Sequence, residues 1–149
     1  MRIGTFEPVN NLSDEYGQIA QHDERVAEAL IASGEFRHAA YFLIQAIEKY
    51  LRSRIFAIVD GRNTYFRDQY RNHSVEEAAD FLVQVISGNV EVQKQIRSQL
   101  DRFVFQGVRF NHLHNNLRYP LFSERFQGFV LLNVNAEDIE SLRSRLRWV

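Results

Sequence analysis

The segment from residue 108 to residue 120 is richer in polar and proton-exchanging side chains than any stretch before it. It reads Val-Arg-Phe-Asn-His-Leu-His-Asn-Asn-Leu-Arg-Tyr-Pro. Histidine transfers protons near neutral pH, because its unperturbed pKa is about 6.5. Arginine binds phosphate or carboxylate groups through paired, charge-assisted hydrogen bonds. The types of residue in this segment therefore suit proton transfer next to a bound anion.

A metal site in this segment is not expected. His112 and His114 would point about 200° apart on a helix, and no acidic residue is near them in the sequence. The chain also has no cysteine, which excludes thiolate ligands, disulfides and a thiol nucleophile. We expect neither a metal nor a cofactor.

The charge of the chain argues against a strong, indiscriminate binder of polyanions, since the formal net charge is −1. Of the 18 basic residues, only Lys49 and Lys94 are lysines. Arginine in such excess fits either a phosphate-binding role or a genome-wide bias in composition. Basic residues outnumber acidic ones from 62 to 130, so an anion site is expected in the second half of the chain.

The length of 149 residues and the hydrophobic content of 45% fit one globular domain spanning 1–149. No apolar run has the length of a signal peptide or approaches the roughly 20 residues of a membrane span. The sequence therefore predicts a cytoplasmic protein.

The candidate segment must be positioned by helices. Residues 34 to 52 form one that carries apolar residues on nearly every turn. Its apolar residues recur at steps of three and four, which places them on one face of a helix. They are Phe36, Ala39, Ala40, Leu43, Ala46, Ile47, Tyr50 and Leu51. Apolar residues beside this face widen it, so we expect a central helix with neighbours on both sides.

Other helices are predicted on either side of the central one. Ser13 or Asp14 caps a helix over 14–33 that Gly34 ends, and the central helix continues to about Val59. Ser74 opens a capping box for a helix over 74–86. Asn89 caps a fourth helix that Gly107 kinks or ends, and Asn135 caps a last helix over 136–147.

The remaining segments are predicted to be irregular. Residues 60–73 form a polar loop with arginines and aromatic residues, and residues 121–134 form a strap over the helices. We find no convincing strand pattern. The predicted fold is all-α, an up-and-down bundle of four or five helices.

Four short motifs, in this order, resemble the HEPN family of small α-helical domains. They are Gly34-Glu35-Phe36, the run from Gln45 to Leu51, His73-Ser74-Val75 and Arg118-Tyr119-Pro120. The resemblance implies a helical bundle that dimerises. Many members of the family are metal-independent endoribonucleases, often toxins paired with a nucleotidyltransferase antitoxin or effectors of phage defence. Other members are non-catalytic partners of such proteins.

Catalytic members of the family carry an arginine, then a polar residue, then a histidine, with four to six residues between the arginine and the histidine. Arg109 and His114 fit this spacing, as do Arg67 and His73. The first pair is favoured, because the family places the motif in the later helix. Phe110 stands where the family has a polar residue, and Asn111 follows one position later.

The resemblance implies the catalytic residues Arg109, Asn111 and His114. His114 would exchange protons with the ribose and the leaving oxygen, Arg109 would stabilise the phosphate, and Asn111 would orient either group. The product would end in a 2′,3′-cyclic phosphate. On a regular helix Arg109 and His114 lie about 140° and about 7.5 Å of rise apart, so we expect activity to require the homodimer.

Other polar residues have structural alternatives. Glu48 could pair with Arg109 across a helix interface or form a purely structural salt bridge. Arg118 and Tyr119 could bind RNA by charge and stacking, although a turn whose tyrosine packs into the core is the more common arrangement. His114 itself could serve only to bond within the bundle. The alternative function is a non-catalytic HEPN module that binds a nucleotidyltransferase or another protein.

Overall fold

A computed structural model describes residues 3–69 and 74–149 of the chain. Most of these residues are helical, which confirms the all-α class. The helices are α1 (Leu12–Ala32), α2 (Phe36–Phe56), α3 (Thr64–Gln69), α4 (Val75–Ile86), α5 (Val90–Leu100), α6 (Phe110–Arg118) and α7 (Ala136–Leu146). A short π-helical segment, Asp101–Phe105, continues α5, and strands β1 (Leu121–Ser123) and β2 (Gly128–Val130) form a hairpin.

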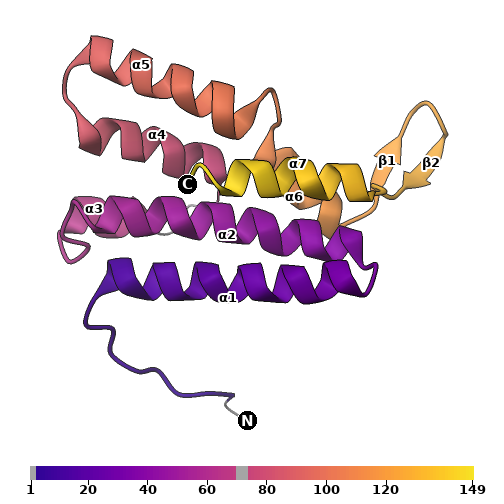
Figure 1. The fold of residues 1–149 in the computed structure, drawn as a ribbon, viewed down its shortest axis with the longest axis horizontal. Helices are drawn as coiled ribbons and strands as arrows, with labels where there is room; N and C mark the ends of the chain where they lie inside the picture. The colour runs from indigo at the N-terminus through magenta and orange to yellow at the C-terminus, as the bar shows by residue number, and fades with distance from the viewer. Residues whose placement is uncertain (1–2, 70–73) are drawn as a thin grey trace.

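Helix α2 is the centre of the fold, as its apolar pattern predicts. It packs on α1 along one side and on α4, α6 and α7 along the other, while α5 lies outermost against α4 (Figure 1). Ala39, Leu43, Ile47, Leu51 and Ile55 of α2 are almost fully buried. Because this helix is buried on two sides, every other layer is positioned relative to it.

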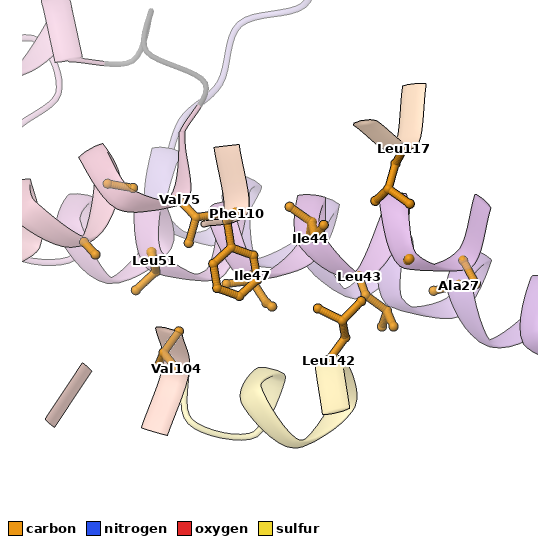
Figure 2. Packing of buried hydrophobic residues seen from close by; sticks show 14 of the residues in the cluster. Ala27, Leu43, Ile44, Ile47, Leu51, Val75, Val104, Phe110, Leu117 and Leu142 are labelled. Carbon is orange, nitrogen blue, oxygen red and sulfur yellow. The ribbon is translucent and has the colours of Figure 1, made fainter. Parts of the chain in front are cut away.

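The hydrophobic core gathers side chains from distant parts of the sequence around α2. Figure 2 shows Phe110 next to Ile47 and Leu51, with Val75, Val104 and Leu142 arranged around them. Phe110 has no solvent exposure and is the largest of the fully buried side chains in the described ranges. The start of α6 is therefore fixed firmly to the central helix.

Helices α1 and α2 form an antiparallel pair joined at Gly34, which has the predicted left-handed conformation with φ of 75°. The N-cap of α1 is Asn11, whose side chain accepts from the amide of Asp14. The prediction of Ser13 or Asp14 as the cap was wrong. The hydroxyl of Ser13 instead donates to the carbonyl of Ser53, 2.8 Å away, and helps to hold α1 against α2.

The predicted caps of three later helices are confirmed. The Ser74 hydroxyl accepts from the Glu77 amide, and the Asn89 side chain accepts from Glu91 and Val92. Asn135 forms a complete capping box with Asp138. The predicted capping box at Ser74 is incomplete, because no hydrogen bond from the Ser74 backbone amide to the Glu77 carboxylate is formed in the described ranges; the Ser74 hydroxyl donates to Glu76.

The prediction of four or five helices omitted α3, which lies inside the predicted loop. It also left the status of α6 open. Gln106 and Gly107 both have positive φ, 47° and 76°, so the chain turns out of the π-helical segment and α6 begins as a separate helix. An HEPN-like arrangement remains an expectation from the sequence motifs.

Residues 121–130 are not a strap over the helices, as predicted, but an antiparallel hairpin at one end of the molecule (Figure 1). Leu121 pairs with Val130 and Ser123 with Gly128. The exposed fraction of Phe129 is 76%. Strands of three residues are too short to show a period-two pattern, so they could not be predicted from the sequence. No helix in the described ranges has the length and hydropathy of a membrane span.

Candidate functional site

Helix α6 carries the favoured candidate residues and is held on α2 by two apolar side chains. Phe110 and Leu117 are buried and lie seven positions apart, on the same face of the helix. Arg109 is the N-cap residue just before the helix, and its carbonyl accepts from the amide of Leu113. Anchored in this way, α6 presents its other residues in fixed directions.

His114 is half-buried between α6 and α2. Its Nε2 atom lies 2.9 Å from the side-chain nitrogen of Gln45. Its ring stacks on Tyr41 with centroids 5.2 Å apart and an interplanar angle of 24°. Tyr41 and Gln45 are one helical turn apart on α2, so together they fix both the position and the tilt of the imidazole.

The contact with Gln45 ties one ring nitrogen of His114 to the side-chain amide of another helix. Which of the two groups donates depends on the tautomer of the ring. A histidine oriented by an amide and a stacked tyrosine is a suitable proton-transfer group. Sequence reasoning missed both partners, because Gln45 and His114 are 69 positions apart.

Arg109 lies on a different side of α6, exposed to solvent. It borders a cavity of about 420 Å³ that is lined by the carboxylates Glu76, Asp80 and Asp101. Asp80 is also paired with Arg97. A phosphate at this position would meet three acidic side chains as well as the Arg109 guanidinium.

Asn111 is exposed near the same cavity. Its backbone amide donates to Oε1 of Glu76, 3.2 Å away. The structure therefore brings Arg109 and Asn111 to the Glu76 side of α6 and places His114 against α2. Within the described ranges, no hydrogen bond or ion pair joins either of the first two side chains to His114.

The alternative pair is only partly described. Arg67 is exposed on α3, and His73 lies outside the residues that the structure describes. Its relation to Arg67 stays a prediction from spacing.

Glu48 is a structural partner of Arg52. Oε1 of Glu48 accepts from Nε of Arg52 at 2.9 Å, and their side chains are only 6% and 5% exposed. The suggested pairing of Glu48 with Arg109 was wrong, since the cation lies one turn further along α2 itself. With Gln45, which contacts His114 of α6, these residues form a polar row at steps of three and four on α2. That spacing was visible in the sequence and signals a shared helix face.

Tyr119 was expected to pack into the core, and this expectation was wrong. Its exposed fraction is 56%, and the Arg118 guanidinium lies over its ring at 5.0 Å. His112 is exposed as well. In the part of the chain that the structure describes, no cluster of three or more His, Asp or Glu residues could hold a metal.

A separate polar cleft of about 440 Å³ lies between α1, α2 and α7. The Tyr50 hydroxyl donates to Glu24 at 3.0 Å, and burial, together with that carboxylate, raises the pKa of Tyr50 to about 12. Arg143 pairs with Glu28 and Glu140, which raises its pKa. The Arg143–Glu28 pair joins α7 to α1, and the Tyr50–Glu24 hydrogen bond joins α2 to α1.

Comparisons of the chain with protein-family models, with curated proteins and with solved structures found no match. Function is therefore inferred from the geometry around α6 and from the HEPN-like motifs.

Proposed function

We propose that the chain is a metal-independent endoribonuclease of the HEPN type that acts as a homodimer, in a toxin or phage-defence system. The observation that carries the proposal is the placement of His114. Its ring is held by Gln45 at 2.9 Å and by the stacked Tyr41, on a helix anchored in the core. Such fixed orientation is what a proton-transfer residue needs.

The proposed reaction is an internal phosphoryl transfer. A general base takes the proton of the ribose 2′-hydroxyl, and the 2′-oxygen attacks the adjacent phosphorus. The bond from phosphorus to the 5′-oxygen then breaks, and a general acid gives that oxygen a proton. The products are a 2′,3′-cyclic phosphate and a 5′-hydroxyl. His114 of one copy serves as the base and His114 of the other as the acid, with Arg109 on the phosphate.

A second copy is needed because Arg109 and His114 lie on different sides of α6. In a twofold dimer beside this helix, Arg109 of one copy can approach His114 of the other. The acidic cavity next to Arg109 makes the monomer a poor phosphate site. The proposal therefore assigns activity to the dimer alone.

The same cavity favours a second candidate function, a non-catalytic module that binds a nucleotidyltransferase or another protein. Three carboxylates around one arginine suit a basic protein surface better than a phosphate. Phe110, at the position where catalytic HEPN members carry a polar residue, is completely buried and can touch no substrate.

Expression in cells separates the two candidates. The ribonuclease proposal expects growth arrest and fragmented RNA with the wild-type chain and with His112→Ala, in which an exposed histidine of α6 is lost. His114→Ala should abolish both effects. Equal growth with all three chains, with intact RNA in each, would favour the binding module.

A further inference from the structure

Another cavity, of about 230 Å³, lies between α2, α6, α7 and the segment that follows the hairpin. Most of its lining is apolar, from Ala40, Val108, Leu113, Leu132, Val134 and Leu142. Its polar lining residues are Asn133, Asp138, Ser141 and Arg145. Pockets for small molecules combine apolar walls with a few polar groups in this way.

The unusual residue of this cavity is Arg145, a buried arginine with a 5% exposed fraction. Its Nη1 donates to the carbonyl of Ser141 at 2.7 Å and to the hydroxyl of the same residue. Over residues 3–69 and 74–149, the buried Nε has no hydrogen-bond partner, and Nη2 makes no hydrogen bond either. Because Nε is completely covered by protein atoms, Nη2 is the nitrogen of this guanidinium that is left for a ligand oxygen.

No carboxylate of the chain neutralises Arg145. All 19 acidic residues belong to the described ranges, and none of them forms an ion pair with this guanidinium. Asp138, the acidic residue of the same cavity, accepts from the backbone amide of Asn135 at 3.0 Å. Burial lowers the pKa of Arg145, although an arginine keeps its proton in proteins. A buried cation without a partner is costly, and a bound anion would offset that cost.

We propose that this cavity binds a small monocarboxylate with an apolar body. The carboxylate would accept from Nη2 of Arg145, and the hydrocarbon would contact Leu113, Leu132 and Leu142. An engineered apolar cavity of about 150 Å³ accepts benzene, so a volume of about 230 Å³ suits a ligand the size of benzoate. The apolar walls disfavour inorganic phosphate, which has no surface to bury there.

Isothermal titration calorimetry of the full chain with benzoate tests the proposal. Benzamide, which has nearly the same shape without the charge, and inorganic phosphate are the matched ligands. Arg145→Met removes the cation with little change in volume, and Arg147→Met makes the same substitution at an exposed arginine two positions later. The wild type and Arg147→Met should each bind one benzoate. The wild type should bind benzamide and phosphate at least about tenfold more weakly than benzoate, and Arg145→Met should bind benzoate at least about tenfold more weakly than the wild type does.

Equal affinity of the wild type and folded Arg145→Met for benzoate would overturn the proposal, as would no saturable benzoate binding by the wild type. Circular dichroism shows whether Arg145→Met is folded. If Arg145→Met is not folded, the affinities of the wild type for benzoate and benzamide decide. Equal affinities would show that no cation recognises the ligand and would overturn the proposal.

Discussion

At the scale of single residues, His114 owes its orientation to side chains of another helix. The Gln45 amide holds its Nε2 and Tyr41 supports its ring face, so neither α6 alone nor its sequence determines where the imidazole points. Phe110 stands where catalytic HEPN members carry a polar residue, and here it is completely buried in the core. Of the three proposed catalytic residues, His114 is the one whose side chain is held by contacts with another helix.

A double-mutant cycle measures the contact between Gln45 and His114. We expect Gln45→Ala, His114→Ala and the double variant to give a coupling of about 1 kcal/mol in the free energy of unfolding by urea, the value of a typical hydrogen bond. The control cycle pairs Gln45 with the exposed His112, and its coupling should stay below about 0.5 kcal/mol. Equal couplings in the two cycles would contradict the described contact.

Tyr50 gives the protein a stability that is sensitive to alkaline pH. Burial, then its hydrogen bond to Glu24, raises its pKa from 10.0 to about 12. Between these values the unfolded chain loses the proton while the folded chain keeps it, so this contribution is complete below pH 10 and is lost as pH rises toward 12. The measurement is the tyrosinate absorbance after rapid mixing into alkaline buffer, for the wild type and for Tyr50→Phe. The difference between the two proteins should titrate with a midpoint near pH 12. A midpoint near 10 would contradict the burial of this hydroxyl.

At the scale of elements, sequence patterns located most helices but not their contacts. Caps made by Ser74, Asn89 and Asn135 were predictable because each is a local side-chain-to-amide bond. The start of α1 was placed at Ser13 or Asp14 because two good capping residues stand next to Asn11, and Ser13 is used across the helix pair instead.

The hairpin and the side chains that contact His114 and Glu48 were harder to predict from the sequence. Strands β1 and β2 are three residues long and exposed, so burial imposes no alternation on them. The contact of Gln45 with His114 depends on how α6 packs on α2, which no local pattern encodes. For the same reason the sequence left two partners open for Glu48, Arg109 across an interface or a structural salt bridge, and the structure shows the second with Arg52 one turn away.

The turn between α1 and α2 depends on the left-handed conformation of Gly34. A Cβ at this position would meet nothing within 4 Å, so Gly34→Ala should cost about 1 kcal/mol of unfolding free energy from backbone strain alone. Gly88→Ala is the matched control, since its Cβ would also meet nothing and its φ is not positive. Urea unfolding should show the loss only in the first variant, and equal stability of both would contradict the turn geometry.

At the scale of the whole molecule, the proposed ribonuclease needs two copies to unite residues that α6 presents on different sides. Mixing the wild type with His114→Ala tests this. Because the proposed reaction takes His114 from both copies, a heterodimer of the two chains lacks either the base or the acid. An equal mixture after refolding should therefore cut RNA at about a quarter of the rate of the same total amount of wild-type chain. A rate of about half, with heterodimers demonstrated by mass spectrometry, would contradict a reaction that needs His114 of both copies.

The most direct test of the proposed function is RNA cleavage by the purified chain in the presence of a chelator. We compare the wild type, His114→Ala and His112→Ala at the same concentration and identify the ends of the fragments. The wild type and His112→Ala should produce 2′,3′-cyclic phosphate ends, and His114→Ala should cut at least about 100-fold more slowly, as expected for loss of a general acid or base. Cleavage that His114→Ala leaves unchanged, or no cleavage by the wild-type dimer, would contradict the proposed role of His114.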